Sequence, residues 1–216
     1  MSKREAVTII GGADGPTSVF VNKRDAKLNL KQKIARWKHN RKKAFIERTL
    51  KPNSHTLDEV MECLVNIYGF VELDADSDEV REEYNEMRAS FIIQYAPELL
   101  GEYAIIPPLK SESKEDIQAQ LASVQERMQK ASEIPTSMFD IDFHKFKKVF
   151  DDINENVYIV VEKKYAYIGG GASGSKKVVK KFQQIYKEIY RHYGVTKEDI
   201  SKKTERYNNV VRALSL

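Results

Sequence analysis

The sequence predicts an α+β fold that is mostly helical, with a small antiparallel sheet and a C-terminal helical hairpin. Over most of the chain, apolar residues recur every three or four positions, which is the spacing of one helix face. Residues 157–168 are instead dense in Val, Ile and Tyr, residue types that favour strands. Because 41% of the 216 residues are hydrophobic and 31% are charged, the composition is that of an ordinary globular protein.

Residues 6–10 and 18–21 predict two short apolar strands at the start of the chain. The Gly-Ala-Asp-Gly-Pro segment between them has turn chemistry, because Asp-Gly favours positive φ angles and Pro16 fixes an extended exit. A long helix is expected next, from about Leu28 to Leu50, and Pro52 ends it.

Three further helices are expected before residue 135. Thr56 and Glu59 have the spacing of a capping box at the start of the first, and Ser77 is the expected cap of the second. The third, from Lys114 to about Ser132, is polar with a narrow apolar face. The inward positions expected on these helices are Leu57, Val60, Met61, Leu64, Val65, Tyr68, Val80, Tyr84, Met87, Phe91, Ile92, Ile117, Leu121, Val124 and Met128.

The last third of the chain predicts a hairpin followed by two helices. Residues 143–150 and 157–168 are the expected strands, and residues 169–174 are expected to form a loop. One helix then runs to Gly194, and a second, capped by Thr196, runs to about residue 214. The chain thus divides into an N-terminal motif segment, a helical region, a linker with a polar helix, and a hairpin with two helices. The alternative is that these segments form one domain. These segments span residues 1–22, 23–109, 110–135 and 136–216.

Composition and motifs favour a non-enzymatic, cytoplasmic protein without a cofactor. No window approaches the roughly 20 apolar residues that a membrane-spanning helix needs. The single Cys63 excludes an intrachain disulfide, which suits a reducing compartment, and its place on an apolar helix face indicates a core residue. The four His residues lack the spacing of metal ligands, so the residues themselves predict no metal site.

Charge is distributed unevenly along the chain. Residues 23–51 hold twelve Lys or Arg against two acids, and residues 58–102 hold thirteen Asp or Glu against two Arg. Either the two segments neutralise each other within the fold, or the basic one is free to bind a polyanion. In the second case cations around an aromatic ring suit nucleic-acid backbone or an anionic membrane surface. The candidate contact residues are Lys31, Arg36, Trp37, Arg41, Lys42 and Lys43.

Two further segments are candidate contacts for nucleic acid. Gly171, Ser175 and Lys176 lie between a predicted strand and helix, where backbone N–H groups can cradle an anion, although the residue order is not that of a P-loop and a flexible connection is the alternative. The turn at Gly194 has the geometry of a helix-turn-helix, and the alternative is a plain helical hairpin. The candidate contact residues after this turn are Lys202, Lys203 and Arg206.

Residues 8–21, Thr-Ile-Ile-Gly-Gly-Ala-Asp-Gly-Pro-Thr-Ser-Val-Phe-Val, resemble a signature of the β subunit of biotin-dependent, sodium-translocating decarboxylases. The resemblance covers these residues and not the rest of the chain. It implies that Asp14 is a sodium-site carboxylate, because unwound backbone and a carboxylate supply the oxygens that a hard cation prefers. The motif residues are Gly11, Gly12, Asp14, Gly15, Pro16 and Thr17.

These patterns lead to one principal functional hypothesis and two alternatives. The principal hypothesis is a protein that contacts nucleic acid or a nucleoprotein through its basic helices. The first alternative is a protein–protein adaptor that uses the acidic residues 58–102 or the N-terminal peptide. The second is a relative of the decarboxylase β subunit that has no transport activity.

Overall fold

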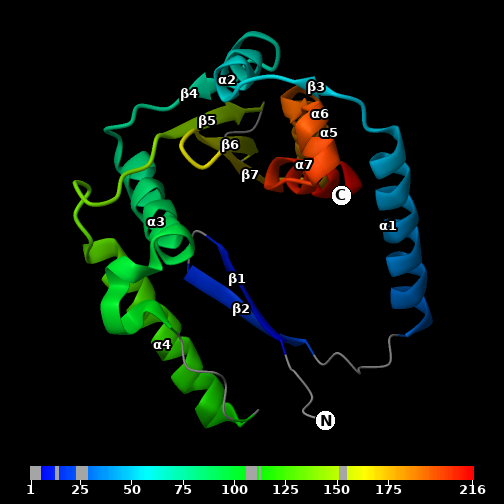
Figure 1. Cartoon of the computed structure of the whole chain (residues 1–216). Helices are drawn as coiled ribbons and strands as arrows, with labels where there is room; N and C mark the ends of the chain where they lie inside the picture. Colours follow the sequence, from blue (N-terminus) through cyan, green and yellow to red (C-terminus); the bar gives the residue numbers. More distant parts are fainter. Residues whose placement is uncertain (1–5, 13–14, 23–28, 106–110, 112, 151–154) are drawn as a thin grey trace. The chain divides into compact units, whose positions relative to one another are not determined.

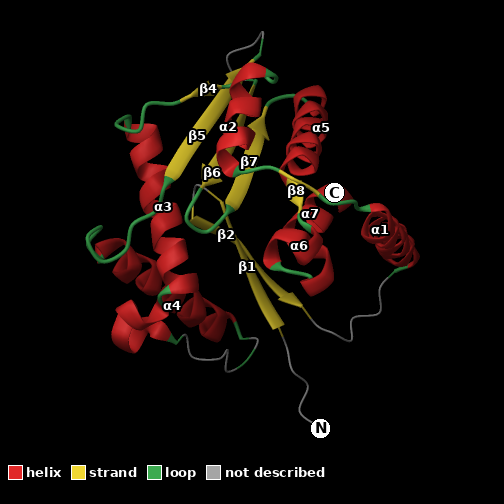
Figure 2. Ribbon diagram, turned by 45° about the horizontal axis from the view of Figure 1, so that its top comes forward, coloured by secondary structure: helices red, strands yellow, loops and turns green. Residues whose placement is uncertain are grey.

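The computed structural model describes residues 29–105, 111, 113–150 and 155–216, and the backbone course of residues 6–12 and 15–22. The fold is mixed α+β and mostly helical, with small antiparallel sheets and a C-terminal pair of helices, as predicted (Figure 1, Figure 2). In the described part of the chain, no helix combines the length and apolar character needed to cross a bilayer.

The N-terminal segment forms a two-stranded antiparallel hairpin, which confirms the two predicted strands. Strand β1, Ala6–Gly12, pairs with β2, Gly15–Asn22, and the register shifts between Ile10 and Gly11. The turn residues 13 and 14 lie outside the described residues, so the predicted role of Asp14 falls there too.

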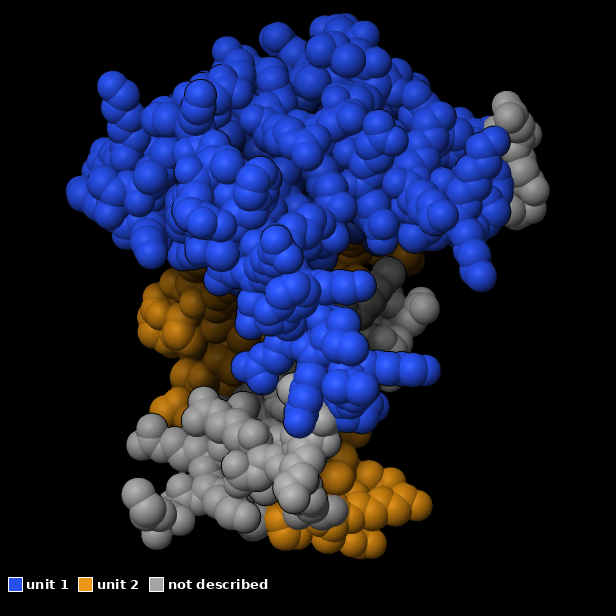
Figure 3. Space-filling model, turned by 90° about the vertical axis from the view of Figure 1, so that its right-hand side faces the viewer, with its two compact units in different colours: residues 1–71, 146–159, 169–216 blue, residues 72–145, 160–168 orange. Residues whose placement is uncertain are grey.

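The chain divides into two compact units, and neither is continuous in sequence (Figure 3). Unit 1 consists of residues 1–71, 146–159 and 169–216, and unit 2 consists of residues 72–145 and 160–168. These divisions differ from the four continuous segments expected from the sequence, because three strands each contribute residues to both units. They are β5, Phe143–Val149, β6, Asn156–Glu162, and β7, Tyr167–Ser173.

Unit 1 is built mainly from helices. These are α1, Leu30–Thr49, α2, Leu57–Asn66, α5, Lys176–Tyr193, α6, Lys197–Lys202, and α7, Glu205–Ser215. Helix α5 packs against α2 and α7, and α1 packs against α7. Buried side chains on these helices include Val60, Leu64, Ile185, Ile189, Val210 and Val211, which places the core of unit 1 among α2, α5 and α7.

Helix caps confirm the positions where two unit 1 helices were expected to begin. Thr56 and Glu59 form a reciprocal capping box at the start of α2, as the spacing predicted. Asn29 and Gln32 form a second box at the start of α1. Cys63 is buried and reduced on α2, and burial raises the pKa of its thiol. Val65 differs from the expectation, because 43% of it is exposed.

Unit 2 holds α3, Asp78–Tyr95, the 3-10 segment η1, Pro97–Ala104, and α4, Lys114–Glu133. Helix α3 packs against α4 and η1. Its core contains Ala89, Phe91, Ile92, Ala96, Leu100, Ala131, Phe139 and Ile141. The expected inward positions of α3 are confirmed at Val80, Phe91 and Ile92, which are buried.

A four-stranded sheet has the order β4-β5-β6-β7. Its strands are β4, Val71–Glu72, β5, Phe143–Val149, β6, Asn156–Glu162, and β7, Tyr167–Ser173. The prediction of one strand over 157–168 and a loop over 169–174 is wrong, because the chain turns after Glu162 and the glycines belong to β7. A Cβ on Gly170 would lie 2.4 Å from the carbonyl oxygen of Tyr158, so glycine permits β7 to approach β6 closely.

The predicted helix from residue 197 to 214 is also wrong in part, because two helices replace it. Lys203 adopts a left-handed conformation with φ 49°, which ends α6. Thr204 then caps α7, and its hydroxyl donates a 2.6 Å hydrogen bond to Asp199 Oδ1. A short strand, β8, Gly194–Val195, precedes α6 and pairs with β3, Asn53–Ser54.

Candidate nucleic-acid interface

Helix α1 presents its cations to solvent. It has 20 residues and is therefore about 30 Å long. It carries eight Lys or Arg residues against the single acid Glu47, and none of its residues is buried. Only residues near its C-terminal end, Ile46, Glu47 and Leu50, are half-buried. The predicted contact residues Lys31, Arg36, Arg41, Lys42 and Lys43 are thus all exposed.

Among the described residues of unit 1, the ion pair of the α1 cations lies within the helix itself, between Lys43 Nζ and Glu47 Oε1 at 3.9 Å. Acids of residues 72–102 have cationic partners inside unit 2. Lys145 Nζ lies 2.8 Å from Glu79 Oε1 and 2.6 Å from Glu83 Oε2.

Lys145 supplies a buried positive charge for this acidic segment. Its side chain is 8% exposed, and burial alone lowers the pKa of a lysine. The hydrogen bonds to Glu79 and Glu83 outweigh that effect, so the pKa of Lys145 is raised. Two acids of this segment therefore have a lysine from β5 as their partner.

Helix α5 adds a second cationic surface that the sequence analysis missed. A shallow groove of about 360 Å³ is lined by Lys180, Gln183, Gln184, Lys187, Glu188 and Arg191. These residues recur every three or four positions on the side of α5 opposite its buried Ile185 and Ile189. The sequence carries a signal for this surface, the basic residues on one face of α5. The apolar residues on the other face predict the helix but not the cationic surface.

Glu188 lowers the positive charge of this groove without cancelling it, because Lys180, Lys187 and Arg191 outnumber this single acid. Both of its carboxylate oxygens accept hydrogen bonds from neutral groups. The Tyr68 hydroxyl donates to Oε2 at 3.0 Å, and Gln184 Nε2 donates to Oε1 at 3.1 Å. Burial, together with this contact to Glu188, raises the pKa of Tyr68 to about 12. The cations of the groove remain available to a ligand.

Lys42 joins the surfaces of α1 and α5. Its Nζ donates a 2.8 Å hydrogen bond to the main-chain oxygen of Leu216. Partial burial lowers the pKa of Lys42, and the neighbouring charges of Lys187 and Arg191 lower it further. Lys187 and Arg191 are therefore close enough to Lys42 for their charges to act on it. We refer to Lys42, Lys180, Lys187 and Arg191, with the exposed cations of α1, as the basic surface.

Trp37 lies within the basic surface. It is 58% exposed, and the guanidinium carbon of Arg41 lies 5.4 Å from its ring centroid. A cation over an indole face is a favourable arrangement that also keeps the ring fixed.

The glycine-rich segment does not form the predicted anion cradle. Gly171 lies in β7, where a Cβ would meet the Tyr158 ring at 2.6 Å. At the start of α5, the Ser175 amide donates to Glu155 Oε1 at 3.2 Å, so the chain's own carboxylate faces this helix terminus. Lys176 is exposed on the first turn.

The C-terminal turn also differs from a free helix-turn-helix, because Gly194 and Val195 pair with β3. Lys202 is exposed and lies 2.7 Å from Glu198 Oε1. Lys203 is exposed and ends α6. Arg206 was expected to contact phosphate, but its Nε donates to the Gly194 carbonyl at 2.9 Å and its Nη2 to the His55 carbonyl at 2.8 Å.

Of the motif residues, Gly11 and Gly12 end β1, and Gly15, Pro16 and Thr17 begin β2. The backbone thus places these five residues on either side of the hairpin turn. The implied sodium site at Asp14 lies outside the described residues.

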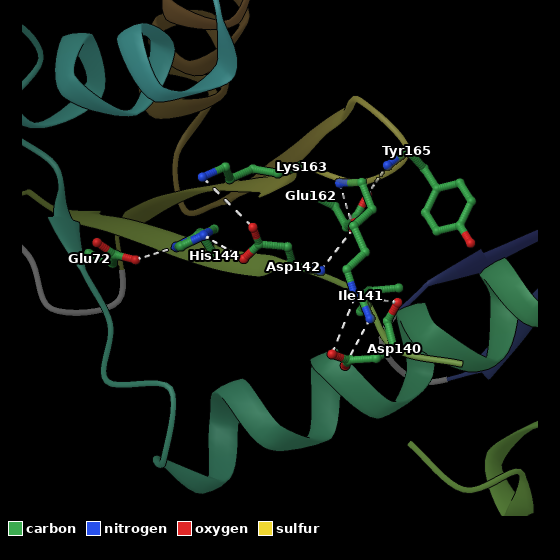
Figure 4. Close-up of polar contacts among 9 residues, drawn as sticks. Glu72, Asp140, Ile141, Asp142, His144, Glu162, Lys163 and Tyr165 are labelled. Atoms are coloured by element: carbon green, nitrogen blue, oxygen red, sulfur yellow. Dashed lines mark hydrogen bonds and ion pairs between the residues drawn. The ribbon is translucent and has the colours of Figure 1, made fainter. Parts of the chain in front are cut away.

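A polar cluster in unit 2 is the other concentration of titratable groups (Figure 4). His144 Nδ1 lies 2.7 Å from Glu72 Oε1, and its Nε2 lies 3.1 Å from Asp142 Oδ1. Glu162 is fully buried and accepts three backbone N–H groups, from Asp142 at 2.9 Å, Lys164 at 3.1 Å and Tyr165 at 2.7 Å. These contacts hold β4, β5 and the turn after β6 together.

A second hydrogen-bonded pair in the same cluster consists of Tyr84 and Asp140. The Tyr84 hydroxyl donates a 2.6 Å hydrogen bond to Asp140, which lowers the pKa of that carboxyl, and burial followed by this contact raises the pKa of Tyr84 to about 12. Both groups are therefore held in their ordinary charge states at neutral pH. Among the residues that the structure describes, no group of His, Cys, Asp or Glu is placed to hold a metal ion.

Fold and site together define an α+β protein with an exposed cationic surface formed by two helices. No protein-family model matches the chain, and no significant match is found among curated proteins or solved structures. We therefore infer the function from the chemistry of the residues themselves.

Proposed function

We propose that this protein binds nucleic acid, alone or in a nucleoprotein, through the basic surface of α1 and α5. The observation that carries the proposal is the groove on α5 that Lys180, Lys187 and Arg191 line, together with the exposed cations of α1. Lys42 of α1 is close enough to Lys187 and Arg191 for their charges to lower its pKa. Like charges repel each other, so an anion bound between them would lower their electrostatic energy. A phosphate backbone supplies such anions at regular intervals along its length.

The distribution of charge around α1 favours nucleic acid over a membrane surface. A helix that lies in a membrane interface separates an apolar face from a cationic face. On α1, Arg41 and Arg48 fall on the same helix face as Leu30 and Ile34, since these positions differ by multiples of one helical turn. Burying that face in lipid would bury two guanidinium groups, whereas a polyanion can contact the helix from several sides.

We place this activity in the cytoplasm. The reduced, buried thiol of Cys63 and the lack of any other cysteine suit a reducing compartment. The proposal requires neither a cofactor nor catalysis.

Salt-dependent binding tests the proposal directly. The affinity of the intact chain for single-stranded and duplex DNA is measured by anisotropy over a range of salt concentrations. The triple variant Lys42→Gln, Lys187→Gln, Arg191→Gln should bind at least tenfold more weakly, with a salt dependence reduced by about two to three phosphate contacts. The control triple variant Lys197→Gln, Lys202→Gln, Lys203→Gln removes the same charge from α6 and should bind like the unchanged protein.

Two results would overturn the proposal. The first is undetectable binding at low salt, where phosphate contacts are strongest. The second is an equal loss of affinity in both triple variants, which would show that net charge matters and the basic surface does not.

A protein partner is the second candidate, favoured by exposed apolar residues within the acidic segment. Ile67 is 72% exposed, Val71 67% and Val65 43%. Capture of a partner by the intact chain that Ile67→Ser and Val71→Ser abolish, while the charge variants above do not, would favour the adaptor.

The resemblance of residues 8–21 supports a separate proposal, a cation site at Asp14 without transport. Sodium should then raise the melting temperature, and Asp14→Asn should remove that increase. An equal melting temperature in sodium and in an equal concentration of a larger monovalent cation would refute it.

A further inference from the structure

Trp37 is the only tryptophan in the chain, and it is exposed at the centre of a cationic helix. Phosphate contacts need only positive charge, which the neighbouring lysines supply without an aromatic ring. An exposed indole does not contribute to the core either, since α1 has no buried residue. Within the described residues, the ring is therefore accessible for contact with a ligand.

Arg41 adds a second planar group beside this ring. Its guanidinium lies over the indole, and it follows Trp37 by one helical turn. The guanidinium is planar and stacks on aromatic faces, so arginine and tryptophan together can receive a base on a fixed platform.

Cations lie on the turns before and after the platform. Lys33 precedes Trp37 by one helical turn. Lys38 follows it by one residue and Lys42 by five, and all three lysines are exposed. A strand whose base stacks on Trp37 would therefore have phosphates within reach of lysines on both sides. This combination of backbone charge and an aromatic face is typical of single-strand binding.

We propose that Trp37 and Arg41 form a stacking platform for an unpaired base, so that the ligand of the basic surface is a single strand. This inference rests on the proposed function and specifies its ligand class. In a duplex, each base has both faces covered by its neighbours in the stack, whereas an unpaired base can expose a face to the indole. DNA and RNA strands share this chemistry.

Fluorescence of Trp37 provides the test, because no other tryptophan contributes to the signal. The intact chain is titrated with oligothymidylate, oligouridylate and a blunt duplex of equal charge. Single strands should quench the emission strongly and the duplex weakly. A further titration with oligodeoxyuridylate, which has the same base as oligouridylate, identifies which sugar is preferred.

Matched variants then separate stacking from charge. Trp37→Ala should lower single-strand affinity by about tenfold, the effect of losing one stacked base, and leave duplex affinity unchanged. Trp37→Phe should recover part of the loss, because it keeps an aromatic face. Phe45→Ala removes another exposed aromatic residue of α1, 59% exposed, and should have a smaller effect.

Distinct results would contradict the inference and the proposed function. Equal binding of single strands and duplex, unaffected by Trp37→Ala, or an equal loss in Phe45→Ala, overturns the platform and leaves the basic surface intact. Failure of every nucleic acid to bind at low salt overturns both. Quenching or a blue shift caused only by vesicles containing anionic lipid would assign the ring to a membrane and overturn the inference.

Discussion

The guanidinium carbon of Arg206 lies 3.8 Å from the centroid of the Tyr193 ring. Its nitrogens also donate to the carbonyl oxygens of His55, Tyr193 and Gly194. Arg206 therefore joins the start of α7 to the end of α5 and to the chain entering α2. An arginine that reads as a nucleic-acid contact in the sequence is a structural residue of unit 1.

We predict that Arg206→Lys destabilises the protein by about 1–3 kcal/mol, because a lysine cannot reproduce the stacked, forked guanidinium and leaves half-buried carbonyls without donors. Chemical denaturation measures the loss. Nucleic-acid affinity per folded molecule should stay unchanged. A variant with normal stability and weakened affinity would restore the phosphate-contact interpretation.

Alanine substitutions at Gly194 and Gly101 can be compared to distinguish the cost of backbone strain from the cost of a steric clash. Both have positive φ, 57° and 55°, but a Cβ on Gly194 would lie 1.5 Å from the Asn53 carbonyl oxygen, and one on Gly101 meets nothing within 4 Å. Gly101→Ala should cost about 1–3 kcal/mol, because φ 55° with ψ −120° is strained for a residue with a Cβ. Gly194→Ala should cost clearly more or prevent folding, since the β3–β8 pairing must separate. Equal melting temperatures for the two variants would contradict the packing described for β8.

Acid should destabilise the start of α6 through Asp199. Burial raises the pKa of this carboxyl, but hydrogen bonds from Thr204 and Thr196 outweigh burial, and the pKa is lowered overall. A lowered folded-state pKa contributes stability above the unfolded value of about 3.9, and that contribution is lost as pH falls through the folded-state pKa. Denaturation from about pH 7 to about pH 2 should show a smaller acid-induced loss in Asp199→Asn than in the unchanged protein. Glu62→Gln, exposed on α2, is the control and should follow the unchanged protein.

Glu162→Gln should destabilise unit 2. The carboxylate accepts three backbone N–H groups in a fully buried position, and an amide retains only one acceptor oxygen. At least one donor would then face the amide NH₂ group, at a cost of about 1–3 kcal/mol. Hydrogen exchange should increase first at the amides of Lys164 and Tyr165. Unchanged exchange there would show that the turn does not depend on the carboxylate, and Glu133→Gln, half exposed, serves as the reference.

The helices and their caps were predictable because their signals are local. The Thr56–Glu59 box, the apolar spacing of α2, α3 and α5, and the polar character of α4 depend on residues within one or two turns of each other. The two N-terminal strands were predictable for the same reason, since a turn separates two short apolar runs.

The strand β7 and the break between α6 and α7 were not predictable in this way. Glycines in a row suggest a loop, and only the approach of Tyr158 explains why they form a strand. No local pattern marks Thr204 as the start of a helix. Its hydrogen bond to Asp199, across the break between α6 and α7, shows this role only in the folded chain.

The sequence by itself determined the helical elements, the number of charges and where along the chain they occur, because periodicity, caps and composition act between near neighbours. The tertiary structure decided which of those charges remain outside. It pairs the acids of unit 2 with Lys145, uses Arg206 internally, and brings Lys42 to Lys187. A side chain's availability depends on partners far away in sequence, and such partners are specified only when the chain has folded.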